Sequence, residues 1–305
     1  MNRVFSYIKN IFFILVILSI APKLIEILKN EYLKNLEQNT KVGYLPIKEF
    51  LSSSHEINKN IKQLFKDSEI KAIFIEMDCS GGANGTGKAL FDEIRTLKKE
   101  YPKPVVVYTE NVCASAGYWV ACSADCIVAS GCALVGSIGV FIPYQFKLKN
   151  FINKHEIQYN VIKAGKYKDV GDPFLDATPE GNEYLQEMID DAYDQFVKDV
   201  AESRKLSTTK QAIETWANGK VFTGNQALQH RLIDKTGSRS TAIEEIKNRA
   251  IIEGKIRWEK LATPGPLTKL FAGEQMDDTP VAKSFIHSIM ESICVFLEER
   301  YRSFV

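Results

Sequence analysis

The chain has 305 residues, of which 45% are hydrophobic and 25% charged, and its formal net charge at pH 7 is +1. These fractions are ordinary for a globular protein, and the length allows one large domain or two small ones. A nucleic-acid-binding protein would show a basic stripe, so the nearly neutral charge argues against that class. The sequence also shows no internal repeat of the period found in solenoid proteins.

The apolar run at residues 11–20 is the membrane signal of the sequence. Ten helical residues cover about half of a ~30 Å hydrocarbon core, and snorkelling of Lys9 and Lys23 would lengthen the span. A cleaved secretory signal peptide is the alternative, because Ser19-Ile20-Ala21 is a small-x-small site. The sequence favours an uncleaved N-terminal anchor over residues 1–30, followed by a polar linker.

Strand and helix patterns alternate after that linker, which covers residues 31–41. Short apolar runs predict strands at 42–47, 71–77 and 105–112. The segments between them show helical spacing, with Ile57, Ile61, Leu64 and Phe65 on one face of the first helix and Leu90, Ile94 and Leu97 on one face of the second. This order predicts an α/β fold with a mostly parallel sheet and flanking helices.

Further elements are expected later in the chain. Strands are predicted at 126–129 and 157–162, a strand and turn at 219–224, and a short helix at 227–232. Thr178 and Glu180 open a long helix, whose expected inner face is Leu185, Met188, Ile189, Ala192, Tyr193, Phe196 and Val200. A C-terminal extension over 256–305 carries a last amphipathic helix.

Small residues follow the strand at 105–112, in the run Cys113-Ala114-Ser115-Ala116-Gly117. Such residues let a strand-to-helix turn bend sharply and present one side chain, which here is Ser115. If Ser115 is a nucleophile, the amides at the start of the next helix point to where an oxyanion would form. The alternative is a packed crossover in which Ser115 only caps that helix.

A serine nucleophile needs a base, and none of the four histidines has a supporting motif. Lys168 lies in a glycine-flanked loop and could serve as that base if burial keeps it neutral near pH 7. Ser137, in a Gly-Ser-Ile-Gly turn, would hold the amine. In the alternative, Lys168 is a solvated lysine paired with Asp169.

The glycine-rich loop expected over residues 78–87 contains Gly81 and Gly82. Their amides could bind an oxyanion or an extended peptide. A phosphate nest is the alternative, although the loop lacks the lysine of a P-loop. The six cysteines lack the spacing of paired zinc ligands, so buried small side chains are favoured over metal ligands or disulfides.

The order of these motifs resembles the signal peptide peptidase A (protease IV) family, serine peptidase family S49. These are membrane-anchored serine proteases with a Ser-Lys dyad on a ClpP/crotonase-like fold. The resemblance covers roughly residues 42–246. Ser115 in CASAGYW matches the nucleophile, Lys168 in GKYKDVGDPF matches the general base, and Ser137 in VGSIGV matches the serine that positions this lysine.

Two more motifs support the resemblance, and two positions depart from it. Gly81-Gly82 matches an S-P-G-G loop beside the oxyanion and substrate backbone, and residues 219–237 match a further family signature. Ser80 replaces the usual proline and Arg231 a common glycine, and neither change removes a catalytic group. The chain holds one copy of the domain rather than the tandem pair of longer members.

The resemblance implies a membrane-associated serine endopeptidase with its peptidase domain at 42–255. Ser115 would form the acyl-enzyme, Lys168 would act as general base and acid, Ser137 would orient Lys168, and the amides of Gly82 and Ala116 would form the oxyanion hole. No metal, nucleotide or other cofactor is implied.

The same resemblance implies that the substrates are extended apolar peptides, such as signal-peptide remnants. It further implies a ring-like homo-oligomer, an octamer, on a bacterial-type cytoplasmic (inner) membrane, with the catalytic domain outside the cytoplasm. Nucleic acid is not an expected partner.

Two other functions stay open. A crotonase-like acyl-CoA hydratase or hydrolase would bind CoA and would not depend on Ser115, and fold alone does not exclude it. A non-catalytic membrane scaffold would assemble without reacting at Ser115.

Overall fold

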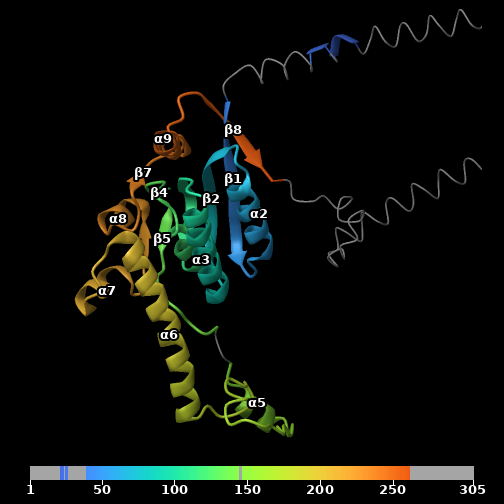
Figure 1. Cartoon of the computed structure of the whole chain (residues 1–305). Coiled ribbons are helices and arrows are strands. Elements are labelled where there is room, and N and C mark those ends of the chain that lie inside the picture. The colour runs from blue at the N-terminus through green and yellow to red at the C-terminus, as the bar shows by residue number, and fades with distance from the viewer. Residues whose placement is uncertain (1–20, 24, 27–38, 144–145, 262–305) are drawn as a thin grey trace, which may run out of the picture. The chain divides into compact units, whose positions relative to one another are not determined.

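The structure, a computed structural model, describes residues 21–23, 25–26, 39–143 and 146–261 (Figure 1). The apolar run expected to form the membrane anchor and the expected C-terminal amphipathic helix lie outside the described residues. By their contacts, residues 1–259 form one unit and residues 260–305 a second. Across the described ranges, no helix has the length and apolar character needed to cross a membrane.

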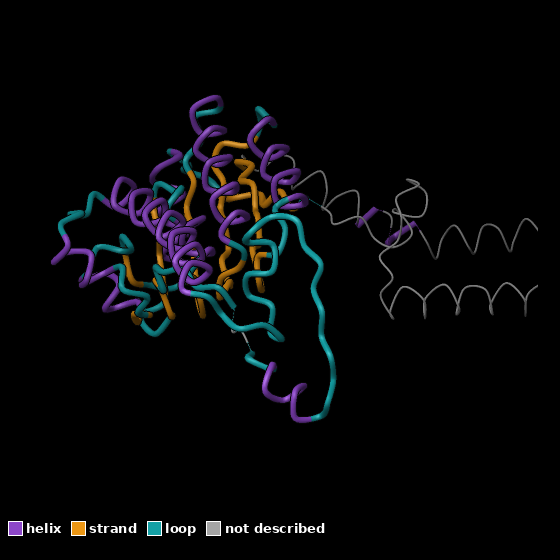
Figure 2. Tube along the Cα trace, turned by 90° about the horizontal axis from the view of Figure 1, so that it is seen from below, coloured by secondary structure: helices purple, strands orange, loops and turns teal. Residues whose placement is uncertain are grey.

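A mostly parallel sheet lies at the centre of the first unit (Figure 2). Its main order is β6-β5-β3-β2-β1-β8, and β4 pairs with both β3 and β7. The β1–β2, β2–β3, β3–β4, β3–β5 and β4–β7 pairs are parallel, whereas β5–β6 is antiparallel. The predicted α/β class is therefore confirmed. The strands are β1 (Asn39–Leu51), β2 (Ile70–Gly82), β3 (Val105–Ala114), β4 (Cys126–Ala129), β5 (Leu134–Gly136), β6 (Val221–Thr223), β7 (Lys235–Thr236) and β8 (Lys255–Lys260).

Helices cover both faces of this sheet. Helix α9 packs on a cluster that includes Val42, Phe74 and Val106. Because successive strand residues point to opposite faces, the alternate residues such as Ile73 and Val107 lie against α2, α3 and α4. The helices are α2 (His55–Lys66), α3 (Asn84–Glu100), α4 (Ala116–Ala121), α5 (Lys149–Lys154), α6 (Pro179–Arg204), α7 (Lys210–Trp216), α8 (Gly224–Gln229) and α9 (Arg239–Ala250).

Strand β3 changes partner along its length. Its first half pairs with β4, and its last three residues pair with β5. Between the pairs Met77–Thr109 and Cys79–Cys113, β3 contains two more residues than β2. Such an insertion bends the strand, and here it turns the end of β3 towards β5, directly before Ser115.

Two predictions of local structure are wrong. The loop expected at 78–87 is instead the end of β2 and the first turn of α3, because β1 continues alongside β2 as far as the Leu51–Gly82 pair. A Cβ on Gly82 would lie 2.3 Å from the Leu51 carbonyl oxygen, so glycine serves this close approach rather than a loop. Residues 157–162 form no strand; they are largely exposed and pair with no strand of the sheet.

We call residues 146–188 the arm: they contain α5, the Lys168 loop and the first part of α6 (Figure 1). Helix α6 has 26 residues and is therefore about 39 Å long. Its predicted inner face is buried only in the second half, at Phe196 and Val200, whereas Met188 is exposed. Other large apolar side chains of the arm are also exposed, namely Phe146, Phe151, Ile157, Tyr159, Ile162, Tyr167 and Tyr184.

Candidate active site

Ser115 occupies a strained turn at the start of α4. Its φ is 51° and its ψ is −128°, and its side chain makes no capping hydrogen bond. A non-glycine residue held in a sparsely populated region costs about 1–3 kcal/mol, and such residues cluster at functional sites. The interpretation of Ser115 as an ordinary helix cap is therefore wrong, and its half-buried hydroxyl is not used as a capping acceptor.

Glycines allow three close approaches around this turn. Gly81 has a φ of 137°, and a Cβ placed on it would lie 2.9 Å from Ser115 Cβ and 3.3 Å from Ser115 Oγ. In the same way, Gly87 of α3 fits against Ala116, and Gly117 fits against Cys79. The serine turn is thus packed directly against the end of β2 and the first turn of α3.

The turn that carries Ser137 lies on the other side of Ser115. The Ser115 amide donates to the Gly136 carbonyl at 2.7 Å, and the Ser137 amide donates to the Lys220 carbonyl at 2.8 Å. Ser137 itself has a φ of 52°. The structure therefore brings together Gly81, Ser115 and Ser137, with Gly82 and Ala116 adjacent to them in the chain.

Lys168 is not part of this group. It is exposed on the arm, and its neighbour Tyr167 stacks on Tyr184 of α6 with 4.8 Å between ring centroids. Twelve residues further along α6, about 18 Å along the helix axis, Phe196 stacks on Trp119 of α4 at 4.3 Å. The Lys168 loop is thus held near the end of α6 that is remote from α4 and Ser115.

In the alternative interpretation, Lys168 is a solvated lysine paired with Asp169; Lys168 is exposed, but Asp169 pairs with another lysine. The Asp169 carboxylate accepts a hydrogen bond from Lys163 Nζ at 2.5 Å, and this bond lowers the pKa of Asp169. Lys168 instead donates through its backbone amide to the Gly165 carbonyl at 3.3 Å.

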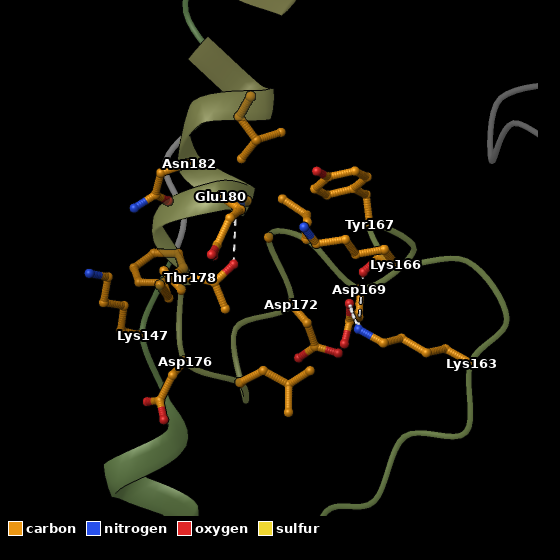
Figure 3. Close-up of a pocket in the computed structure, with 17 residues that line it drawn as sticks. Lys147, Lys163, Lys166, Tyr167, Asp169, Asp172, Asp176, Thr178, Glu180 and Asn182 are labelled. Atoms are coloured by element: carbon orange, nitrogen blue, oxygen red, sulfur yellow. Dashed lines mark hydrogen bonds and ion pairs between the residues drawn. The ribbon is translucent and has the colours of Figure 1, made fainter. Parts of the chain in front are cut away.

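A cavity of about 250 Å³ lies within the arm (Figure 3). Its wall mixes the cations Lys147, Lys163 and Lys166 with the anions Asp169, Asp172, Asp176 and Glu180. The Thr178 hydroxyl, also in the wall, caps α6 by accepting from the Gly181 amide at 3.0 Å. Neither Ser115 nor Lys168 lines this cavity, so it is separate from the serine turn.

Two aromatic residues fix α4 behind Ser115. Tyr118 Oη donates to the Leu232 carbonyl at 2.6 Å, and Trp119 Nε1 donates to Asp199 Oδ2 at 2.9 Å. Asp199 is buried and also lies 3.2 Å from Lys88 Nζ. Sequence reasoning missed Asp199; the available signal was an acidic residue three positions after Phe196, within the buried part of α6.

The five cysteines in the described ranges are free thiols. Cys79, Cys113, Cys122 and Cys126 are buried, as predicted, and Cys132 is exposed. Burial raises the pKa of Cys122 to about 12 and that of Cys126 to about 11. Over the same ranges, no cluster of three or more His, Cys, Asp or Glu side chains could hold a metal ion.

The chain is similar to several curated proteins. It is 38% identical over 190 residues to a protein of Methanocaldococcus jannaschii named as a candidate protease, a match that covers 62% of this chain and 60% of that protein. A candidate protease of Synechocystis is 30% identical over 209 residues, with 68% and 74% covered. A candidate signal peptide peptidase SppA of Enterococcus faecium is 29% identical over 187 residues, with 61% and 53% covered. The chain thus spans between about half and three quarters of these relatives' lengths.

Among solved structures, the 1510-N membrane-bound stomatin-specific protease is similar, with a TM-score of 0.49 and 16% identity. That match covers 74% of this chain and 99% of the other. ClpP1 of Listeria monocytogenes gives a TM-score of 0.44 at 14% identity, with 66% and 94% covered. Residues 97–253, which include Ser115, Ser137 and Lys168, match the model of peptidase family S49. The chain belongs to peptidase family S49.

Proposed function

We propose that this chain is a serine endopeptidase with Ser115 as its nucleophile. The observation that carries the proposal is the strained Ser115 turn, whose hydroxyl caps no helix and lies against Gly81. A strained residue that the surrounding packing holds in place is typical of a working site. Membership in the family supplies the reaction class.

In the proposed reaction, Ser115 Oγ attacks the peptide carbonyl while Lys168 Nζ takes the hydroxyl proton. The amine then gives this proton to the leaving nitrogen, and an acyl ester remains on Ser115. Water attacks the ester, and its proton returns through Lys168 to Ser115. The amides of Gly82 and Ala116 would stabilise the oxyanion, and Ser137 would orient Lys168.

Lys168 must come close to Ser115 for this reaction, and we propose that it reaches the Ser115 of a neighbouring copy. The stack of Tyr167 on Tyr184 fixes its loop to the remote part of α6. The exposed aromatic and aliphatic side chains of the arm offer an apolar surface for such a contact. A head-to-tail contact of this kind forms a ring when the rotation between copies closes, and such a ring fits the expected homo-oligomer, an octamer.

The proposed substrates are extended apolar peptides such as signal-peptide remnants. The apolar run at residues 11–20 would hold the enzyme at a bacterial-type cytoplasmic membrane. The peptidase domain at 42–255, with a ClpP/crotonase-like fold, would lie on the extracytoplasmic side. An enzyme beside the bilayer meets such remnants at high local concentration.

Covalent labelling tests the nucleophile and its base. The purified protein is treated with a fluorophosphonate and analysed by peptide mass spectrometry, beside Ser115→Ala and Lys168→Ala variants with unchanged thermal unfolding. We expect an adduct on Ser115 that Lys168→Ala strongly reduces, together with cleavage of an unfolded apolar peptide. A wild-type protein that is neither labelled nor able to cut this peptide contradicts the proposal, and CoA binding would then favour the acyl-CoA enzyme.

Mixing the two inactive variants tests the sharing of the dyad. Co-refolded Ser115→Ala and Lys168→Ala chains should recover activity if the base comes from a neighbour, because about a quarter of the contacts in a randomly mixed ring pair an intact serine with an intact lysine. A mixture that co-assembles but stays inactive would place both residues of the dyad in one chain.

A further inference from the structure

An exposed aromatic side chain lies beside the serine turn and has no role in the proposed reaction. Phe50, near the end of β1, is 65% exposed, whereas the next residue, Leu51, is 2% exposed. Leaving most of a phenyl ring exposed forgoes much of the favourable free energy of its burial. Neither the proposed reaction nor any motif of the family resemblance includes this position.

The strand register places Phe50 next to the site. Phe50 pairs with Gly81 across the parallel β1–β2 ladder, and Gly81 is the residue that lies against Ser115. Neighbouring strands are about 4.8 Å apart, so the Phe50 backbone is one strand further from Ser115 than Gly81. All three residues lie at the carboxyl ends of their strands, the edge of a parallel sheet where ligands usually bind.

The backbone around Phe50 is held firmly. After a register shift at Glu49, whose φ is 63°, Phe50 and Leu51 pair with β2 again. The Phe50 carbonyl also accepts from the Ser52 amide at 3.0 Å. After Phe50, the Leu51 carbonyl accepts from the Ala83 amide at 2.9 Å. The ring is therefore presented from a fixed strand end rather than from a loose loop, as a contact that discriminates between ligands requires.

We propose that Phe50 is a specificity-determining residue that contacts an apolar side chain of the peptide substrate. This inference rests on the proposed peptidase function. An extended peptide lying across the ends of the strands would cover two strand spacings between Ser115 and Phe50, at about 3.3 Å per residue. The recognised side chain is therefore two or three residues from the scissile bond, and it is aromatic or branched aliphatic.

Peptide cleavage kinetics test this role. Each fluorogenic peptide of a series carries a single leucine at one of the three positions on either side of the scissile bond. For each of these peptides, a second peptide has serine instead of that leucine. For the wild type, one position should show a clear leucine-to-serine preference in kcat/KM. Phe50→Ala should reduce that preference about ten- to hundredfold, while Phe50→Leu should keep most of it.

Controls separate this inference from the proposed function. Ile251→Ala removes an apolar side chain that is 85% exposed at the end of α9, and it should leave the preference unchanged. Labelling of Ser115 by a small fluorophosphonate should be equal in wild type and Phe50→Ala. A wild type that neither labels nor cuts refutes the peptidase itself. A Phe50→Ala enzyme that labels and cuts with the wild-type preference, or that loses activity equally on every peptide because its oligomer has changed, refutes the role of Phe50.

Discussion

Replacement of Gly81 by alanine is the sharpest test of how the serine turn is built. The change adds one methyl group, and the structure places that methyl 2.9 Å from Ser115 Cβ. Real Cβ atoms essentially never approach another carbon so closely, so Ser115 or the end of β2 must shift. The φ of 137° at Gly81 adds backbone strain for any L side chain.

Two effects with different magnitudes follow. The strained backbone should cost about 1–3 kcal/mol, and each kcal/mol lowers the Tm of a domain of this size by about 2–4 °C. The displacement of Ser115 should be a few tenths of an ångström or more. Because a misplacement of about 1 Å can cost about a hundredfold in rate, we expect kcat/KM to fall by about ten- to hundredfold.

Gly85 provides the matched control. It lies in the first turn of α3, and a Cβ placed on it meets no atom within 4 Å. Gly85→Ala should leave kcat/KM unchanged and the Tm equal or slightly higher, because alanine is the better helix former by about 1 kcal/mol. The assay combines thermal unfolding, the rate of fluorophosphonate labelling and peptide cleavage for both variants. A Gly81→Ala enzyme with wild-type labelling, cleavage and Tm would refute the close approach of Gly81 and Ser115.

Three further predictions concern buried groups and thiols. Asp199→Ala leaves Trp119 Nε1 without its acceptor and should cost about 1–3 kcal/mol in chemical denaturation, while Asp199→Asn should cost less; equal losses would contradict the hydrogen-bond argument. In the native protein, a maleimide should modify the exposed Cys132 and leave the buried Cys113 unmodified until denaturation, and rapid native labelling of Cys113 would contradict its burial. Burial raises the pKa of Cys122 from 9.0 to about 12, so the thiol ionises at lower pH in the unfolded chain than in the folded one. Its contribution to the free energy of unfolding is therefore full below about pH 9 and decreases as pH rises towards 12. Cys122→Ala should flatten this part of the stability curve, and an unchanged curve would refute the raised pKa of Cys122.

Much of the fold follows from local patterns. Residues Val105–Tyr108 are apolar without interruption, and they form an interior strand buried on both faces. Thr178 followed by Pro179 and Glu180 marks a helix start, and the Thr178 hydroxyl does cap α6. These features depend on neighbours in sequence, so the sequence alone contains the information.

Features that depend on partners far along the chain escaped prediction. The glycines after Asp78 suggested a loop, but Gly82 and Gly87 are needed because Leu51 and Ala116 approach them closely. The expected strand at 157–162 lacks a partner strand. Glycine content and apolar alternation do not show which distant segment packs against a given stretch. Whether that stretch forms a loop, a strand or a helix depends on this distant segment.

The site shows the same division. Ser115 could be proposed from the small residues after a strand together with the family resemblance, because those small residues alone also fit a packed crossover. The insertion in β3 that turns this strand towards β5 left no comparable signal, since it is defined only by the register against β2. The position of Lys168 also depends on the length and direction of α6, which the helical period predicts without saying what the helix packs against.

Helix α6 connects these observations. Its apolar face continues along its whole length, but this chain buries only the second half, at Phe196 and Val200. If the first half contacted no other protein, the exposed Tyr184 and Met188 would favour aggregation, and polar residues at these positions would make the chain more soluble. The buried half holds α4 behind Ser115 through the Trp119 stack and Asp199, and the exposed half holds the Lys168 loop. Because α6 is one continuous helix, the contacts that fix α4 would also set where Lys168 is presented to a neighbouring copy in the proposed ring.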